Sequence, residues 1–532
     1  MDSKLQFKHF DVECITPYEV KMIIDKLDSN KSTGIDGIGP KILKHCGDYI
    51  TPAIAHIINN SILHGVFPDS LKIANVIPIF KQGEKTDPCN YRPISILPTI
   101  SKVFERHIAG QIHKYFKYTD MLHTGQSGFR KEHSCQTALT RLVDTWLKDI
   151  DTGKYVGAVF LDLRKAFDLV DHQILLHKLK LYHFTDKTVK LLSSYLNNRK
   201  QRIKINGSYS KTLTIKSGVP QGSILGPLLF LIYINDISLA LNDIKIDLYA
   251  DDSTLYKSDS NITTIETNLQ DSLIKINKWC FDNNMSLHPG KSKCMVMASN
   301  YKMKYSRELC LSINNIKLEN VQVHKLLGIY IDNTISWKYQ ISKVCTKLNS
   351  KLALLKRISY YLSNDMKRMF YNAYIMPTFE YCCIIWGKGI RSKTCINKIT
   401  KIQKRAARII LCMPLKTSSK FMFNELQWLS FEKRCAYHLG VQIYKCKNGL
   451  IPETISSLIT FSNNESYQLR SIKRNDLMPQ LKPRTNYIKD TFSYCSTNIW
   501  NDIPLFIRNT VSLNSFKSNY KKFLICKQFN EV

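Results

Sequence analysis

Two adjacent carboxylates, Asp251 and Asp252, restrict the possible folds of this chain more than any other feature. Residues 244–248 before the pair alternate between apolar and polar side chains, and residues 253–256 after it are again β-prone. At about 4 Å and an effective dielectric of about 20, two like charges repel by about 4 kcal/mol. A fold that holds them together therefore raises one pKa or binds a cation, whereas the solvated turn of a hairpin is the alternative for the pair taken alone.

A second apolar segment also ends in a carboxylate. Residues 156–161 read VGAVFL and are followed by Asp162, within the longer segment FLDLRKAFD at residues 160–168. A continuous apolar run of this length is typical of a buried strand. Because two strands carry carboxylates at the same kind of position, a metal site is favoured over a solvated turn.

The charge of the chain indicates a polyanionic partner. Among 532 residues, 76 Lys and Arg stand against 43 Asp and Glu, which leaves a formal net charge of +33. The hydrophobic content of 44% excludes an intrinsically disordered chain, and 27 Tyr with 23 Phe supply rings that can stack on bases. Nucleic acid is therefore the predicted partner, and a membrane surface is the weaker alternative.

Cysteine usage and apolar runs predict an intracellular protein. The 16 cysteines show no zinc-type spacing and are interpreted as reduced. The first residues lack a basic and then apolar secretory signal, and the longest apolar run, residues 224–234, is shorter than the roughly 18 residues that a membrane span needs. We therefore expect neither secretion nor a transmembrane segment.

A basic amphipathic helix is predicted near residue 400. Its apolar face includes Ile399, Ile402 and Ile409, and residues 398–408 contain no acid that could form helical ion pairs. The cations of the opposite face, which we take as candidate nucleic-acid contacts, are Lys398, Lys401, Lys404, Arg405 and Arg408.

Four further segments carry local predictions. Residues 217–223, SGVPQGS, form a Gly/Pro-rich turn before an apolar helix, where glycines allow close approach of a ligand. Asn206-Gly207 is a strong hairpin signal, and residues 325–331 are predicted to form one strand. Long helices are expected from about residue 338.

In their order and spacing, these segments resemble the motifs of reverse transcriptases from non-LTR (LINE, jockey-like) retrotransposons. The matching segments are residues 90–95 (NYRPIS), 128–130 (GFR), 160–168, 218–222 (GVPQG), 249–252 (YADD), 327–328 (LG) and 498–504 (NIWNDIP). The resemblance implies an α+β right-hand polymerase with fingers, a palm built on an antiparallel sheet, and a helical thumb. The implied domains are an N-terminal pre-finger extension (1–59), fingers and palm (60–337), thumb (338–425) and a mostly helical C-terminal extension (426–532).

The resemblance also implies site residues. Asp162, Asp251 and Asp252 would hold two Mg²⁺ ions, with Mn²⁺ as a second candidate, for in-line phosphoryl transfer. Phe167 would be a steric gate against the ribose 2′-hydroxyl, its alternative being a core aromatic. The remaining implied nucleotide contacts are Gln221, Gly222, Arg130, Arg92 and Lys81, together with Lys291 or Lys293, between which the sequence does not decide.

The implied activity is RNA-directed DNA synthesis with template RNA, primer DNA and dNTPs as partners, in the cytoplasm and nucleus. Three alternatives stay open: a catalytically silent or domesticated RNA-binding remnant, a group II intron maturase, and a nucleotidyl cyclase. Members of the group usually carry an upstream endonuclease, so we expect nicking activity to come from elsewhere or to be lost by truncation. The sequence gives no indication of oligomeric state.

Overall fold

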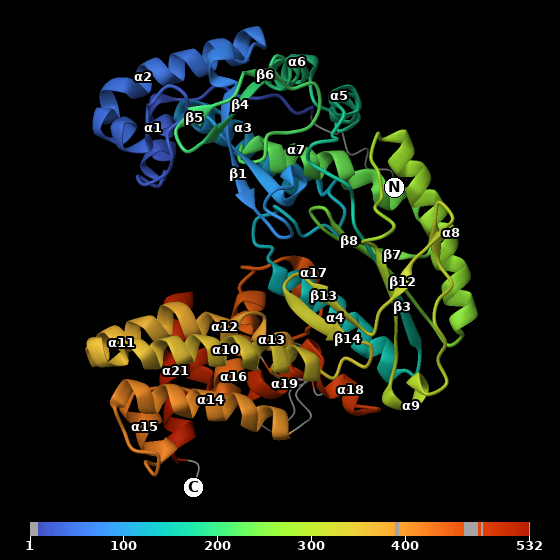
Figure 1. Cartoon of the computed structure of the whole chain (residues 1–532), viewed down its shortest axis with the longest axis vertical. Coiled ribbons are helices and arrows are strands. Elements are labelled where there is room, and N and C mark those ends of the chain that lie inside the picture. Colours follow the sequence, from blue (N-terminus) through green and yellow to red (C-terminus); the bar gives the residue numbers. More distant parts are fainter. Residues whose placement is uncertain (1–8, 389–392, 462–476, 480–481, 531–532) are drawn as a thin grey trace, which may run out of the picture. The chain divides into compact units, whose positions relative to one another are not determined.

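The computed structural model describes residues 9–388, 393–461, 477–479 and 482–530 (Figure 1). Helices and short sheets are combined, as expected for an α+β chain. The chain forms two compact units, each assembled from segments distant in sequence. The first contains residues 1–130, 161–253 and 272–291, and the second contains residues 131–160, 254–271 and 292–532. The sequential division into extension, fingers and palm, thumb and C-terminal extension stays a prediction.

The sheet of the first unit is built around β1 (Ile73–Phe80). This strand pairs antiparallel with β2 (Tyr91–Ile96) and parallel with β4 (Lys200–Ile205). Two short strands, β5 (Ser208–Tyr209) and β6 (Leu213–Thr214), both pair antiparallel with β4.

The predicted hairpin turn lies between β4 and β5. Asn206 and Gly207 both have positive φ, of 48° and 86°, as a tight two-residue hairpin turn requires.

Six helices lie wholly within the described part of the first unit, and one of them is buried on all sides. They are α1 (Pro17–Asp25), α2 (Pro40–His64), α3 (Thr99–Thr119), α5 (His172–Leu181), α6 (Asp186–Leu196) and α7 (Leu225–Ile234). The sequence of α7, LGPLLFLIYI, has no polar face, and nine of its ten residues are buried. A helix that is apolar all round belongs in a core. It directly follows the Gly/Pro-rich turn at residues 217–223 and therefore fixes the end of that turn.

The main sheet of the second unit contains the strand that precedes Asp162. Strand β3 (Tyr155–Leu161) is buried along its whole length, as its continuous apolar run predicts. It pairs antiparallel with β9 (Lys293–Met297), which pairs parallel with β12 (Glu319–Asn320). The other neighbour of β3 is β8 (Asp252–Asp259). The sheet is thus mixed at its β12 edge rather than antiparallel throughout.

The prediction of one strand over residues 325–331 is wrong. The chain forms a hairpin of β13 (Val323–Leu326) and β14 (Ile329–Asp332). Leu327 and Gly328 between them have φ values of 44° and 88°, so the backbone reverses direction there. The Tyr381 hydroxyl donates to the Leu327 carbonyl at 2.7 Å and stabilises this strained turn.

Most of the remaining described part of the second unit is helical. The longer ones are α4 (Cys135–Asp151), α8 (Ile262–Asp282, shared with the first unit), α10 (Lys338–Ile358), α14 (Lys393–Leu411), α16 (Phe431–Lys447), α19 (Phe492–Asp502) and α21 (Leu513–Asn530). Shorter elements are α9 (Asn300–Met303), β10 (Ser312–Ile313), β11 (Ile316–Lys317), α11 (Asn364–Phe370), α12 (Met376–Glu380), α13 (Cys383–Trp386), α15 (Ser419–Glu425), α17 (Glu453–Ser456), α18 (Asn486–Lys489) and α20 (Leu505–Arg508). In the described part of the chain, no helix combines the length and apolarity of a membrane span.

One hydrophobic core joins the C-terminal helices to the rest of the second unit. It extends from Leu139 in α4 through Leu348 in α10 to Trp500 in α19 and Leu524 in α21. Residues 426–530 are therefore packed into this unit as far as they are described.

A buried carboxylate strengthens the contact between α4 and α19. Asp144 has a fully buried side chain and pairs with Lys148 at 2.8 Å. Its Oδ1 also accepts from the backbone N–H of Ser493 at 3.1 Å, near the start of α19. A buried polar group of this kind destabilises the folded protein when its hydrogen-bond partner is removed.

We expect Asp144→Ala to destabilise the second unit by about 1–3 kcal/mol, because the Ser493 N–H is left buried without its acceptor. Thermal unfolding followed by circular dichroism checks this, with Asp271→Ala on the exposed side of α8 as the matched control. Equal melting temperatures for the two variants would contradict the role assigned to Asp144.

Candidate active site

Asp162 directly follows β3, and the loop that it begins is tied to a second segment. The carbonyl oxygen of Asp162 accepts from the His288 N–H, and the Arg164 N–H donates to the Ser286 carbonyl, both at 2.8 Å. These two hydrogen bonds hold residues 286–288 beside the loop. The backbone of the half-buried Asp162 is thereby fixed beside residues 286–288.

Asp251 lies in the turn that connects β7 (Lys245–Tyr249) with β8. Ala250, just before it, has a φ of 59°, a left-handed conformation that is unfavourable for a residue with a Cβ. The segment around Gly128 supports this turn: Gln126 Oε1 accepts from the N–H groups of Gly128 and Ala250, at 2.8 and 3.4 Å. A Cβ at position 128 would lie 2.3 Å from the Ala250 nitrogen, so only glycine fits there.

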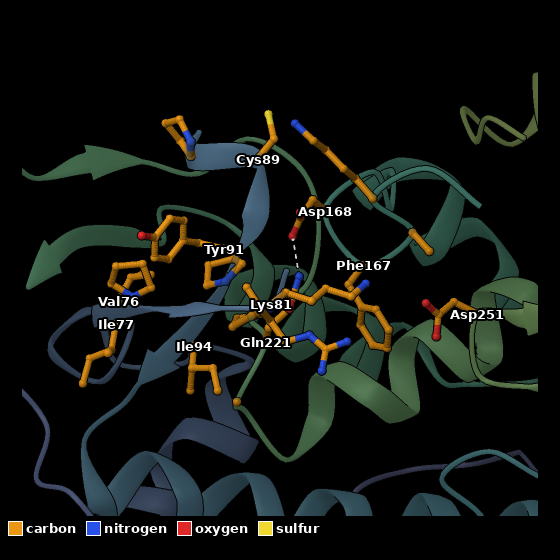
Figure 2. A pocket seen from close by; sticks show the side chains of 18 of the residues that line it. Val76, Ile77, Lys81, Cys89, Tyr91, Ile94, Phe167, Asp168, Gln221 and Asp251 are labelled. Carbon is orange, nitrogen blue, oxygen red and sulfur yellow. Dashed lines mark hydrogen bonds between the residues drawn. The ribbon is translucent and has the colours of Figure 1, made fainter. Parts of the chain in front are cut away.

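Asp162 and Asp251 line the same cleft, which has a volume of about 1810 Å³ (Figure 2). All of its lining residues belong to the first unit. Asp252, the first residue of β8, is not part of the lining. The cationic lining residues are Lys81, Lys85, Arg92, Arg164, Lys165, Lys204 and Lys291. The cleft thus offers a few carboxylates among many cations, which suits a substrate that carries both phosphates and metal ions.

The three predicted acids repel one another. Desolvation, followed by the charges of Asp251 and Asp162, raises the pKa of Asp252 to about 6, and Lys81 acts in the opposite direction. Asp252 is also exposed at the surface, so water screens part of this repulsion. The carboxylates are thus close enough for one of them to hold a proton more tightly than an isolated aspartate.

Carboxylate oxygens are the ligands that Mg²⁺ prefers, so the donor set fits a hard divalent cation. Nevertheless, among the described residues no group of three or more His, Cys, Asp or Glu side chains is arranged to hold a metal ion. Mg²⁺ usually keeps waters and takes one or two carboxylates plus substrate phosphates. The acids therefore fit a site that the substrate completes, rather than a closed protein cage.

The turn at residues 217–223 is fastened on both sides. Its Gly218 and Val219 N–H groups donate to the carbonyls of Val170 and Phe167, at 2.8 and 2.9 Å. On the other side, the Gln221 carbonyl accepts from the Ser95 N–H at 2.7 Å.

Gly222 is required in this turn for two reasons. Its φ of 119° is disfavoured for other residues, and a Cβ there would lie 2.5 Å from the Ser95 carbonyl oxygen. Gln221 and Gly222 both line the cleft, next to the loop that carries Asp162.

Sequence reasoning missed Glu105, which supports the end of the same turn. This fully buried residue of α3 accepts from the N–H groups of Ile224 and Leu225 at 2.6 and 3.2 Å, where α7 begins. Burial raises the pKa of its carboxyl, which Arg199 and the hydrogen bonds partly offset. A carboxylate at this position caps the helix and complements its dipole. The available signal was that Glu105 is the single acid of α3 and shares a helical stripe with the apolar Ile108 and Ile112.

Phe167 lies between a core and the cleft. Its half-buried ring stacks on the fully buried Phe230 of α7 at 4.4 Å and meets Phe129 edge to face at 6.1 Å. It also lines the cleft, as one of the side chains labelled in Figure 2. The two interpretations of this residue, core aromatic and gate, are therefore compatible.

The predicted phosphate contacts differ in position. Lys81 and Arg92 are exposed and line the cleft. Arg130 is not among the lining residues, and its guanidinium donates to the carbonyls of His123 and Gln126 at 3.2 and 3.1 Å. Here Arg130 closes the loop that supports Ala250, and its contact with a triphosphate stays a prediction.

The structure separates the two lysines between which the sequence did not decide. Lys291 is exposed and lines the cleft. Lys293 belongs to β9 and forms an ion pair with Glu319 at 2.5 Å. Lys291 is therefore the better placed of the two to act on a bound nucleotide.

The basic helix is α14, and it has the predicted two faces. Ile399, Ile402 and Ala406 are buried, whereas Lys398, Lys401 and Arg405 are exposed. Lys404 and Arg408 lie at the edge of the exposed face with intermediate exposure. Arg405 donates to Asn349 of α10 at 3.1 Å, and α10, like α14, contains no acid. The two packed helices thus offer a cationic surface within the second unit.

Comparison with known proteins identifies one family match. Residues 81–331 match the family described as reverse transcriptase (RNA-dependent DNA polymerase). The chain is 30% identical to the probable RNA-directed DNA polymerase from transposon X-element of Drosophila melanogaster, over 74% of this chain and 44% of that protein. It is also 30% identical to the RNA-directed DNA polymerase from mobile element jockey of Drosophila funebris, over 75% of this chain and 44% of that protein. The chain thus spans less than half the length of these relatives.

We expect the difference in melting temperature between the wild type and Asp252→Asn to depend on pH. The pKa of Asp252 is about 6 in the folded protein, above the ordinary aspartate value of 3.8, so its contribution to stability is lost as pH rises from about 4 to above 6. In EDTA, the wild type should therefore lose stability relative to Asp252→Asn over this range.

Adding Mg²⁺ should stabilise the wild type more at pH 7 than at pH 5, because protons compete with the cation for the carboxylates. Differential scanning fluorimetry at matched ionic strength measures both effects. A difference between the two proteins that stays constant from pH 4 to pH 7 would show that the pKa of Asp252 is not raised in the folded protein.

Proposed function

Residues 81–331 form a reverse transcriptase domain, homologous to those of jockey-type non-LTR retrotransposons, and from this premise we propose that the chain is an RNA-directed DNA polymerase. It would add dNTPs to a primer 3′-hydroxyl on an RNA template, in the cytoplasm or nucleus. The observation that carries the proposal is the cleft that Asp162 and Asp251 share with Phe167 and Gln221.

Asp162 and Asp251 would hold two Mg²⁺ ions, with Mn²⁺ as an alternative, and Asp252 would add its charge from the start of β8. The bound ions would activate the primer hydroxyl and stabilise the leaving pyrophosphate. The protein's own part is positioning: the backbone ties of Asp162 and the Gln126-supported turn of Asp251 keep the carboxylates in place. Reorganisation during the reaction is thereby reduced.

The cations of the cleft would bind the triphosphate. Lys81 directly follows β1 and Arg92 lies in β2, and both residues line the cleft. The β1–β2 hairpin would therefore belong to the fingers. Lys291 would neutralise or protonate the leaving pyrophosphate. Each of these contacts is charge-assisted and weakens with salt.

The cationic surface of α10 and α14 would contact the template–primer backbone as a thumb does. Its exposed lysines and arginines face no acid on their own helices, so phosphates are their natural counterions. On this basis we propose that residues 338–425 form the thumb, and we assign residues 60–337 to fingers and palm as the family resemblance implies.

We expect the purified chain to extend oligo(dT) on poly(rA) with dTTP and Mg²⁺. Asp251→Asn should lower the rate at least about 100-fold, because it removes a negative charge from the metal site. Template–primer affinity, measured by fluorescence anisotropy, should stay within about twofold, since the cationic surfaces are unchanged. Asp282→Asn, an exposed aspartate of α8 outside the cleft lining, is the matched control.

Extension that Asp251→Asn leaves unchanged would contradict the proposed function. Template–primer binding without any incorporation by the wild type would instead favour an RNA-binding remnant of such an element.

Replacing Phe167 by alanine should admit ribonucleotides. Without the ring, a 2′-hydroxyl meets no steric obstacle, and discrimination between dTTP and UTP should fall at least about 10-fold in kcat/KM. Single-nucleotide incorporation measures this ratio directly. A loss of activity with both nucleotides at an unchanged ratio would mean that Phe167 serves only the packing against Phe230.

A further inference from the structure

A buried lysine of the second unit contacts an exposed cysteine. Lys367 lies in α11 and is 5% exposed, whereas Cys412 directly follows α14 and is open to solvent. The Lys367 ammonium donates to Cys412 Sγ at 3.1 Å and to Asn364 Oδ1 at 3.3 Å. The two groups that meet this buried cation are therefore a sulfur and an amide oxygen, rather than a carboxylate.

The position of the Lys367 amine is set by helix packing. Lysines on a protein surface normally extend their charged end into water, because burial of an ammonium is unfavourable. Here α11 begins after Ser363, whose hydroxyl accepts from the Met366 N–H at 3.3 Å, and the helix packs against α14. The amine is thus held beside the sulfur by two packed helices, unlike a flexible contact between surface side chains.

Cys412 is fixed from its own side. Its φ is 55°, a left-handed conformation that a residue with a Cβ adopts only where surrounding contacts determine it. The Met413 N–H donates to the Arg408 carbonyl at 3.1 Å and closes the last turn of α14. Because solvent reaches Cys412 while Lys367 is shielded, a small oxidant meets the sulfur first. The amine is then already at hydrogen-bond distance from the oxidised atom.

We propose that Cys412 and Lys367 form an oxidative modification site, which a hydroperoxide converts into a covalent sulfur–nitrogen cross-link. The sulfur of Cys412 first attacks hydrogen peroxide: an S–O bond forms, the O–O bond breaks, and water leaves a sulfenic acid behind. The Lys367 ammonium gives one proton to solvent, and its nitrogen attacks the sulfenic sulfur. An S–N bond forms, the S–O bond breaks, and the hydroxyl leaves as water with a second proton from the amine. The sulfur loses two electrons, and the peroxide gains them. This site does not depend on the polymerase function.

Peptide mass spectrometry after treatment of the whole chain with hydrogen peroxide tests the cross-link. In the wild type, we expect a linked pair of peptides that contains both residues and is lighter by two hydrogens than the separate peptides together. Dithiothreitol should return the two free peptides, because a thiol reduces the S–N bond. Cys412→Ser and Lys367→Arg should both lack the linked pair. Lys367→Arg keeps a cation in place, so it separates loss of the amine from loss of the charge.

A second measurement follows the sulfenic acid, which dimedone traps. In Lys367→Met, the trapped fraction at Cys412 should rise at least about fivefold over the wild type, because the intermediate has lost its acceptor. Cys310, another exposed cysteine of the same unit, is the internal reference and should be trapped equally in both proteins. Melting temperatures of the two Lys367 variants are measured in parallel, so that a folding defect is recognised.

Several results would overturn the proposal. Equal trapping at Cys412 in the wild type and in Lys367→Met, or no reaction of Cys412 with peroxide, would leave Lys367 as a charge that stabilises the C-terminal end of α14. Loss of two hydrogens within a single peptide around Cys412 would make a backbone nitrogen the acceptor. A link from Cys412 to another cysteine would make the product a disulfide. Failure of the wild type to extend a primer would refute the proposed polymerase function and leave this site unaffected, since neither measurement uses activity.

Discussion

Repulsion between carboxylates is the constraint around which the first unit is arranged. Burial, followed by the charges of Asp251 and Asp162, raises the pKa of Asp252 to about 6, in a chain whose formal net charge is +33. Such a cluster is unfavourable without a cation, and only a rigid backbone keeps it from spreading apart. The structure supplies that rigidity through hydrogen bonds to the main chain of the two loops that carry Asp162 and Asp251. The cluster thus lowers the stability of the free protein. Binding of a charged substrate with its metal ions would restore that stability.

The unfavourable turn at Ala250 follows from the same requirement. A left-handed alanine persists only where surrounding contacts determine its conformation, and Gln126 and Gly128 provide these contacts. Arg130 then closes the supporting loop through two carbonyl oxygens. The GFR segment at residues 128–130 therefore has a structural reason to occur with YADD in one chain, whatever else Arg130 contacts when substrate is bound.

Features determined by local pattern could be predicted from the sequence, and features determined by tertiary partners could not. The apolar run before Asp162, the Asn206-Gly207 turn and the two faces of α14 each follow from periodicity or turn chemistry, and the structure has all three. The hairpin at Leu327-Gly328 was missed because leucine rarely adopts positive φ, and the contact with Tyr381 that stabilises it lies 54 residues away. Glu105 and Asp168 escaped prediction for the same reason, since their partners lie 119 and 53 residues further along the chain.

Glu105 and Asp168 together indicate how the turn at residues 217–223 is held in place. Glu105 fixes the start of α7 from the core, where low dielectric makes its hydrogen bonds strong and their loss costly. Asp168 fixes the Gln221 side chain at the solvent side, where a single exposed hydrogen bond contributes little to stability. The buried acid therefore sets where the turn lies, while the exposed acid links it to the loop of Asp162. Loss of the exposed contact therefore costs the fold little, whereas loss of the buried contact would leave the N–H groups at the start of α7 without their acceptor.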